Sequence, residues 1–228
     1  MKRAIAVFVG LLTTIASAAA QMPVAIVEEI QGKVTGAQFM DYLTPKTVIK
    51  LGNKSSIVIS YLKSCRREKI EGVGTVIIGT EESLVHLSSV KADQPECDAN
   101  HANTTTQETN GVAATLFRSA ELSGNSKKND NSMTPQLTLY GASPLVQARG
   151  HGTLVVERLD ERGERLRIDL NGKQQFRDKF YDFVAHKQAL SPGGIYLAKF
   201  KSSQIVFEID AHARPGATPL VGRLLVMD

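Results

Sequence analysis

Tryptophan is absent from this 228-residue chain, and aromatic residues make up only 6% of it. Both facts argue against a sugar-binding platform, because such platforms stack sugar rings on aromatic side chains. A large excess of one charge is also missing, since 27 Lys and Arg residues face 23 Asp and Glu residues. The formal net charge of +4 falls to +2 without Lys2 and Arg3, which lie in a predicted leader. That excess is too small to indicate nucleic acid as a partner.

Long apolar runs are missing beyond the N-terminus, where a shorter run has the pattern of a secretory signal. Two cations precede an apolar run at residues 4–15, and small residues follow at 16–20. The run is shorter than the about 20 residues that cross a bilayer. We therefore predict that residues 1–20 are a cleaved signal peptide and that the mature chain begins at Ala19 or Gln21. It is expected to have no stable membrane insertion and to be periplasmic in a Gram-negative bacterium, or secreted.

Cysteine is scarce as well: Cys65 and Cys97 are the only two, and they lie 32 positions apart. Neither belongs to a C-x-x-C redox motif or to a zinc-type cluster. An oxidising compartment favours joining such a pair, and closing a loop of this length contributes about 3–4 kcal/mol. We predict a structural disulfide. The alternative is a catalytic thiol at Cys65 that a distant histidine activates.

Short apolar runs separated by turn residues predict β-structure from residue 23 to residue 98. Residues branched at the β-carbon dominate these runs, which suits a half-buried pleated surface. The alternation at Ile57, Ile59 and Tyr61 is typical of a strand with one buried face. The expected strands are Val24–Val27, Thr47–Leu51, Ser55–Tyr61, Gly72–Gly79 and Leu84–Val90.

Three segments of this region occur in a recognisable order. Gly32-Lys33-Val34 forms a glycine turn, Leu43 to Gly52 introduces a strand, and Ile57 to Tyr61 follows as the next strand. Together they resemble the FecR-like periplasmic domain family over residues 23–98. The resemblance implies a β domain with a repeated, β-roll-like pattern. Family members that regulate sigma factors carry a membrane helix and a cytoplasmic segment, which are not expected here, so that role is not carried over. The segment around Cys65 departs from the family and suggests a disulfide-bearing subgroup.

The composition changes at residue 99. Residues 99–135 are mostly polar and aperiodic, which predicts a linker, although residues 112–122 could form a short strand or a few helical turns. Strand patterns resume over residues 136–228, and their spacing predicts a β-sandwich-like domain. Strand spacing is the only feature that suggests the immunoglobulin-like type. Residues 171–190 receive no assignment. The expected strands are Gln136–Tyr140, Thr153–Leu159, Arg165–Leu170, Ile195–Phe200, Gln204–Ile209 and Gly222–Met227, with a hairpin loop at 161–164. The mature chain is therefore predicted to be all-β.

No motif for catalysis or for cofactor binding is recognisable. Gly72-Val73-Gly74 lacks the third glycine of a dinucleotide-binding loop, and Gly141 to Leu145 lacks the closing glycine of a nucleophile elbow. The five histidines are widely separated, and His86 is expected to be a structural or surface residue on a strand. We expect no catalytic residue, no cofactor and no metal.

A cluster of cations offers one candidate contact site. Lys63, Arg66 and Arg67 flank Cys65 and could bind an anionic envelope polymer or an acidic partner. The alternative is a solvated loop in which these charges have no ligand.

Carboxylates offer two further candidates. Glu81 and Glu82 follow a glycine turn and form a weak cation-site candidate, because no regular spacing of oxygen ligands follows them. The run from Glu157 to Arg165 could hold an acid pair for sugar hydrolysis. Its alternating charges are more typical of a solvated hairpin that resists edge-to-edge aggregation.

These observations favour a non-catalytic, exported β-rich protein of the bacterial envelope that acts in binding, assembly or as a signalling accessory. A protein partner from the envelope is expected, and the sequence specifies neither that partner nor an oligomeric state. The alternative is an envelope hydrolase that acts on glycan or peptidoglycan with a site assembled from distant residues. Polar residues gathered in one cleft would favour the enzyme. An exposed apolar edge or patch would favour the binding module.

Overall fold

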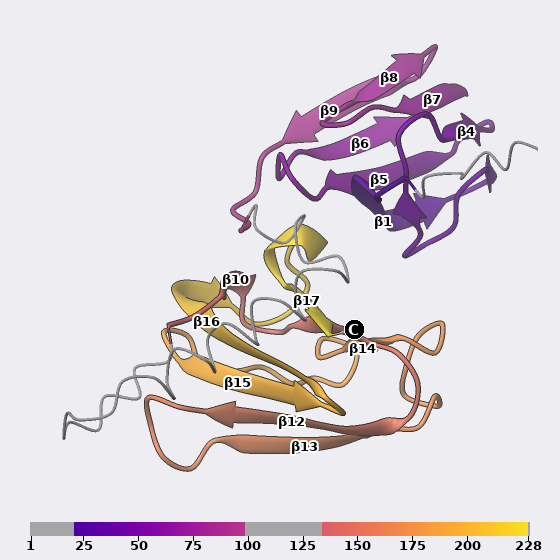
Figure 1. Cartoon of the computed structure of the whole chain (residues 1–228). Helices are drawn as coiled ribbons and strands as arrows, with labels where there is room; N and C mark the ends of the chain where they lie inside the picture. The colour runs from indigo at the N-terminus through magenta and orange to yellow at the C-terminus, as the bar shows by residue number, and fades with distance from the viewer. Residues whose placement is uncertain (1–20, 99–133, 228) are drawn as a thin grey trace, which may run out of the picture.

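Four β-sheets make up the described chain, and each takes its strands from one half of the sequence (Figure 1). The structure is a computed structural model that describes residues 21–98 and 134–227. Helical structure within these residues amounts to one 3-10 turn, η2 (Leu220–Gly222), and no helix among them is long and apolar enough to cross a membrane. The predicted all-β class is therefore confirmed. The predicted signal peptide, residues 112–122 and most of the predicted linker lie outside the described residues.

The first half folds as two antiparallel sheets with a shared core. Side chains alternate along the strands, so each sheet turns an aliphatic row inward, such as Ile57 and Ile59 from one sheet and Val76 and Ile78 from the other. The first sheet has the order β3 (Tyr42–Leu43), β1 (Ala25–Gln31), β5 (Ser56–Tyr61), β6 (Arg67–Glu71), β9 (Ser89–Asp93). The second has the order β2 (Val34–Thr35), β4 (Val48–Leu51), β7 (Gly74–Ile78), β8 (Ser83–His86).

Four of the five strands expected in this half are confirmed as β1, β4, β5 and β7, and the fifth is wrong. The run Leu84–Val90 is not one strand, because β8 and β9 belong to different sheets. Leu87 lies between them with a left-handed backbone, φ 68°, which ends β8 and turns the chain toward the other sheet. The sequence also does not predict β6, since Ile70 is the only apolar residue in that strand.

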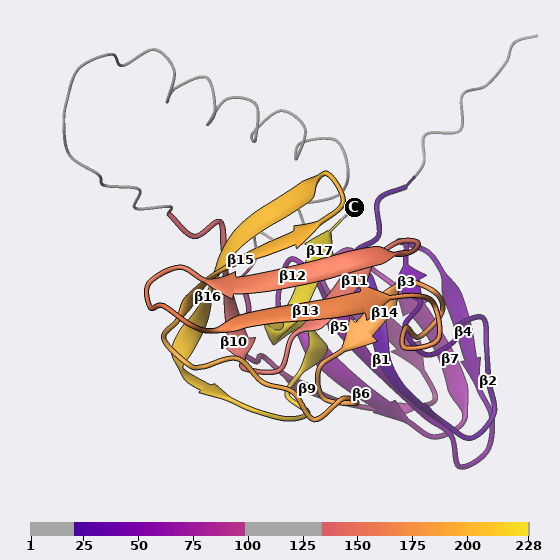
Figure 2. The ribbon, with the colours of Figure 1, turned by 90° about the horizontal axis from the view of Figure 1, so that it is seen from below.

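The second half packs a five-stranded sheet against a three-stranded sheet, seen one behind the other in Figure 2. Apolar side chains from both sheets, such as Leu154 and Phe207 from the larger and Val146 and Met227 from the smaller, form one core. The larger sheet has the order β10 (Leu137–Gly141), β16 (Ser203–Arg214), β15 (Ile195–Phe200), β12 (Gly152–Arg158), β13 (Arg165–Leu170). The smaller has the order β14 (Phe180–Asp182), β11 (Leu145–Ala148), β17 (Leu224–Met227).

The expected hairpin is confirmed, because β12 and β13 pair antiparallel with Glu157 opposite Arg165. Two pairs, β10 with β16 and β11 with β17, are parallel and join residues far apart in the sequence. The spacing of apolar runs does not reveal such pairs. The unassigned residues 171–190 contain β14 and turns.

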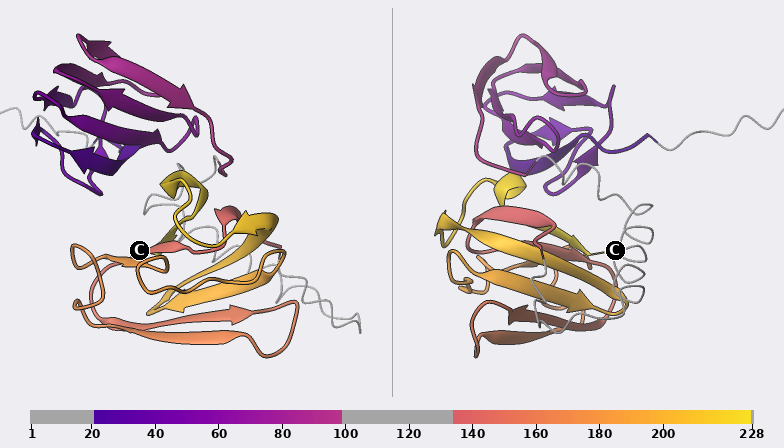
Figure 3. Two further views of the ribbon diagram at one scale, coloured as in Figure 1. Left: turned by 180° about the vertical axis from the view of Figure 1, so that it is seen from behind. Right: turned by 60° about the vertical axis from the view of Figure 1, so that its left-hand side comes forward.

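A third apolar cluster joins the two halves, and in Figure 3 the yellow η2 turn lies against the first half. Beside it the Tyr42 hydroxyl donates a hydrogen bond to Gln147 Oε1 at 2.8 Å, and Arg177 forms an ion pair with Asp41. We call this set of contacts the inter-half contact. Its apolar members are Ile26, Met40 and Leu62 from the first half and Leu145, Phe180, Leu220, Val221 and Leu224 from the second.

Candidate functional site

The disulfide predicted from the sequence is present and lies at one end of the first half. Cys65, in the turn between β5 and β6, is bonded to Cys97, four residues beyond the end of β9. Cys65 therefore carries no free thiol, and the alternative of a catalytic thiol is wrong. The bond ties the chain that leaves β9 to the turn beside it.

Two of the three cations in the predicted cluster form close ion pairs with carboxylates. Arg66 Nε lies 2.7 Å from Glu68 Oε1, and Arg67 Nε lies 2.7 Å from Glu28 Oε2. Lys63 is exposed and forms no ion pair with any described residue. The three side chains thus do not form one free cationic surface, and an anion contact through them stays a prediction.

Glu68 is the centre of a buried polar network that positions β8. Its side chain is only 1% exposed, and besides Arg66 it accepts a hydrogen bond from the backbone N–H of Ser83 at 3.2 Å. The hydroxyl groups of Ser83 and Tyr61 lie 2.8 Å apart, and burial raises the pKa of Tyr61 to about 12. The network joins the first residue of β8, in the second sheet, to β5 and β6 in the first. It therefore fixes the position of β8 against the first sheet.

Glu28 connects the same region to the second half. Its carboxylate accepts hydrogen bonds from Ser60 Oγ, Arg67 Nε and the backbone N–H of Leu220, each at 2.7 Å. A carboxylate with three donors has its charge satisfied inside the fold. Arg67 is therefore a structural cation of the inter-half contact.

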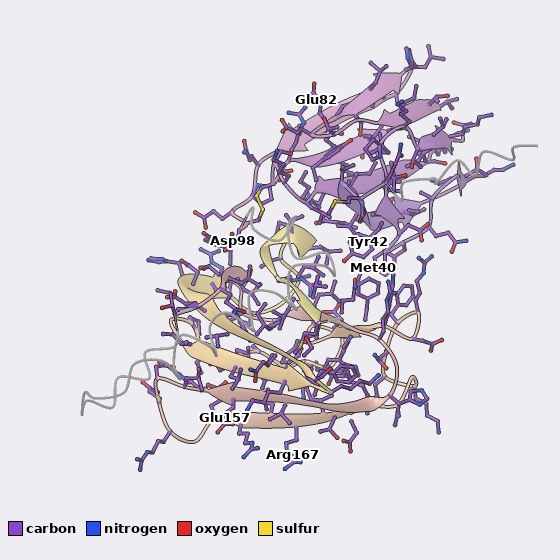
Figure 4. The ribbon with its side chains drawn as sticks, viewed as in Figure 1. Met40, Tyr42, Glu82, Asp98, Glu157 and Arg167 are labelled. Atoms are coloured by element: carbon purple, nitrogen blue, oxygen red, sulfur yellow. A yellow bond between two sulfur atoms is a disulfide. The ribbon has the colours of Figure 1, made fainter. Side chains whose placement is uncertain are left out.

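An open hollow of about 720 Å³ lies beside the disulfide, between the β5–β6 turn, the β7–β8 turn and the end of β9. Ser64 connects the other two lining segments by hydrogen bonds. Its hydroxyl donates to the carbonyl of Glu81 at 3.0 Å, and its carbonyl accepts from Gln94 Nε2 at 3.1 Å. Figure 4 shows Glu82 on the side of the first half opposite Met40 and Tyr42. The lining residues are Ser64, Arg66, Gly79, Thr80, Glu81, Glu82, Ala92, Asp93 and Gln94.

β9 lies next to this hollow and, among the described residues, forms a free edge of its sheet. It is the last strand of its sheet and pairs only with β6 among the described strands. All five of its residues, Ser89–Asp93, are exposed. The unpaired N–H and C=O groups of such an edge can pair with another strand.

Four exposed aliphatic side chains lie on β8, on β9, in the turn between these strands and in the β6–β7 turn. Leu84 is 59% exposed and Leu87 is 94% exposed, and they are joined by Val73 and Val90 at 54% and 40%. Val73 adjoins Gly74, whose backbone packs against His86 and Ser88. We call Val73, Leu84, Leu87 and Val90 the β8–β9 corner. A run of exposed aliphatic residues beside a free edge is typical of an interaction surface.

The carboxylate run in the second half is a solvated hairpin with internal ion pairs. Arg158 lies 2.9 Å from Asp160 and 3.2 Å from Glu161. The hydrogen bond from Arg158 lowers the pKa of Asp160 to about 2, whereas a general acid for glycoside hydrolysis needs a raised pKa. Glu164 accepts a hydrogen bond from the Tyr196 hydroxyl at 2.7 Å. These contacts favour the structural interpretation of the run.

The metal candidates find no support in the described residues. No group of three or more His, Cys, Asp or Glu side chains there is placed to hold a metal ion, and Glu81 and Glu82 have no third ligand. His86 is exposed on β8, as expected of a surface histidine.

Sequence reasoning missed the two buried carboxylates, Glu28 and Glu68, and the free edge of β9. The signal for Glu68 was the alternation of charges in Arg67-Glu68-Lys69, which is typical of a strand with paired charges on its faces. Glu28 has no comparable signal, because its donors Ser60, Arg67 and Leu220 are distant in the sequence.

Comparisons with known proteins identify no relative. No protein-family model matches the chain, and neither the curated proteins nor the solved structures contain a match.

Proposed function

We propose that the protein is a non-catalytic, exported binding module of the bacterial envelope and that its partner adds a strand to the free edge of β9. The observation that carries the proposal is that all five residues of β9 are exposed beside the β8–β9 corner. An added strand forms main-chain hydrogen bonds with the edge, and its side chains pack on the exposed aliphatic residues. This mode of binding needs no sharp sequence motif, which agrees with the absence of one here.

The charge of β9 favours a different protein over a second copy as the partner. Lys91 is the central residue of the strand. Two β9 strands paired antiparallel about their centres would place one Lys91 opposite the other, and like charges directly opposite each other destabilise a sheet. A central lysine is a common device against self-association of edge strands.

The surroundings of β9 hold the edge in place before a partner arrives. The disulfide anchors the chain beyond β9, and the Glu68 network anchors the start of β8. A preorganised edge loses less conformational entropy on binding than a mobile one. These contacts support a role in recognition.

The proposal retains the FecR-like character of residues 23–98 and an export signal at residues 1–20. In support, Gly32 lies in the turn between β1 and β2 with φ 74°, a conformation that favours glycine. Leu43 and Gly52 bracket the segment that carries β4. A disulfide agrees with an oxidising compartment such as the periplasm.

Site-specific photocrosslinking in cells tests the proposal. We expect a benzophenone amino acid at Val90 to give an adduct with one protein, whose crosslinked peptide is an extended segment. The matched control carries the same group at Arg167, on the edge strand β13 of the second half, and is expected to give no such adduct. Equal adducts at both positions would contradict the proposal. So would turnover of a peptidoglycan, glycoside or ester substrate that a single substitution abolishes without unfolding the protein.

A further inference from the structure

The hollow lies at the carboxyl end of β9, where a strand added to β9 would begin or end. Ala92 and Asp93 belong to both the strand and the lining of the hollow. The other end of β9, at Ser89, follows Leu87 of the β8–β9 corner. One added strand would therefore extend from the hollow to the exposed aliphatic residues.

Acidic charge predominates in this hollow and is accessible to solvent. Glu82 is 70% exposed and lies 3.5 Å from Arg66, whose closer partner is Glu68. Asp93 is 60% exposed, and its carboxylate lies 3.7 Å from Arg67 on the outer face of the sheet, whereas Ala92 faces inward. The closer partner of Arg67 is Glu28.

Glu81 forms no ion pair with any described residue. Arg66 and Arg67 are thus each paired more closely with a buried carboxylate than with an exposed one. The exposed acidic groups are left available to a cation from outside, and the accessible arginine charge is reduced, which disfavours an anionic ligand.

We infer that the segment bound by β9 carries a basic side chain at its amino-terminal end, received by Glu81 and Glu82 in the hollow. The inference rests on the proposed function, because it specifies the chemistry of the strand that β9 pairs with. Antiparallel pairing is slightly more stable per residue than parallel pairing. An antiparallel strand begins opposite Asp93, so its first residues lie at the hollow.

The same register sets the rest of the segment. Ile70, which is buried in the core, lies opposite Val90 in the β6–β9 pair, so Val90 extends the inner face of the sheet. The added residue opposite Val90 is therefore apolar, and it reaches the β8–β9 corner. The residue opposite Lys91 is polar or acidic, because Lys69 already lies opposite Lys91 on β6 and a further cation would be repelled. The partner segment is thus extended, with a basic residue at its amino-terminal end and an apolar residue toward its carboxyl-terminal end.

Peptide titrations of the full mature protein, followed by backbone amide shifts of the ¹⁵N-labelled chain, test this inference. The probes are synthetic peptides of about eight residues with alternating Thr and Val and blocked ends. One carries two Lys residues at its start, one carries them at its end, and one carries none. At millimolar concentrations we expect all three to shift amides of β9. The first peptide should also shift Gly79 to Glu82 and bind about three- to five-fold more tightly than the others, an advantage that salt diminishes.

The double variant Glu81→Gln/Glu82→Gln is expected to remove that advantage and to leave the β9 shifts unchanged. Both side chains are exposed, so circular dichroism should show an intact fold. The matched control, Glu157→Gln on the hairpin of the second half, should keep the advantage.

Two different failures are distinguishable. Equal binding of the three peptides, tighter binding of the peptide with Lys at its end, or an advantage that survives the double variant would overturn the inference alone. If no peptide shifts any amide of β9, the proposed function fails with it.

Discussion

At the scale of single residues, Glu68 is the side chain on which the first half depends most. It is buried between Arg66 and the backbone of Ser83, and it joins β6 to β8. We expect Glu68→Gln to lower the free energy of unfolding by about 1–3 kcal/mol, since a charge-assisted hydrogen bond is lost in a buried site. Urea unfolding measures the change.

The matched control for Glu68 is Glu71→Gln on the same strand. Glu71 pairs with Lys69 at 2.7 Å on the exposed face, where ion pairs contribute little. No measurable loss of stability is expected from this variant. Equal losses from the two variants would show that the buried network has no special role.

Tyrosine titration gives a second test at this scale, and the absence of tryptophan makes its absorbance easy to follow. Burial raises the pKa of Tyr61 and of Tyr196 to about 12, against an ordinary value of about 10. Between these two pH values the unfolded chain releases protons that the folded chain retains. Stability is therefore expected to fall as the pH rises from about 10 to about 12.

In the folded protein we expect a late step of tyrosinate absorbance near pH 12, which Tyr61→Phe reduces. Tyr196→Phe is expected to reduce the same step and is the internal control. A single step near the ordinary pKa for all five tyrosines of the folded protein would contradict the burial of both hydroxyls.

At the scale of elements, the disulfide and β9 depend on each other. Cys97 follows β9 closely, and its bond to Cys65 closes a loop of 32 positions that includes β6 to β9. We expect Cys65→Ser/Cys97→Ser to lower the free energy of unfolding by about 2–5 kcal/mol. Hydrogen exchange should accelerate first in β9, because that strand has only one neighbour.

The control for this element is β13, an edge strand of the second half that the disulfide does not enclose. Its exchange is expected to stay unchanged in the double variant under native conditions. Acceleration that is equal in β9 and β13 would mean that the bond acts only on global stability.

At the scale of the whole molecule, the inter-half contact is expected to keep the halves together after cleavage between them. The polar composition of residues 99–135 predicts first cleavage there by proteases. The apolar cluster and the hydrogen bond from Leu220 to Glu28 then join the two fragments without the connecting chain. We expect both fragments to coelute in gel filtration under native conditions.

Leu220→Asp tests this contact, because Leu220 is 6% exposed within the apolar cluster. The variant should separate the cleaved fragments, since an unpaired carboxylate is costly in an apolar site. Leu159→Asp, at a position 39% exposed, should leave them associated. Separation of the unsubstituted fragments would contradict a stable contact.

Local sequence patterns are sufficient to predict most strands of this chain. Alternating aliphatic residues separated by glycine and polar turns specify strands, because the side-chain period of a strand is two. The all-β class, the hairpin of β12 and β13 and the pairing of the only two cysteines follow from such local or counting arguments, and all three are confirmed. The leader, the domain boundaries and the FecR-like resemblance stay predictions.

Which strand faces and sheet edges are covered depends on tertiary contacts that local patterns do not encode. The alternation at Ile57, Ile59 and Tyr61 predicts one buried face for β5, yet all six residues of that strand are buried. The outer face is buried as well, because η2 from the other end of the chain contacts β5. For the same reason the exposure of β9 and the partners of Glu28 and Arg67 could not be predicted. They depend on contacts between residues far apart in the sequence, and no local pattern encodes those contacts.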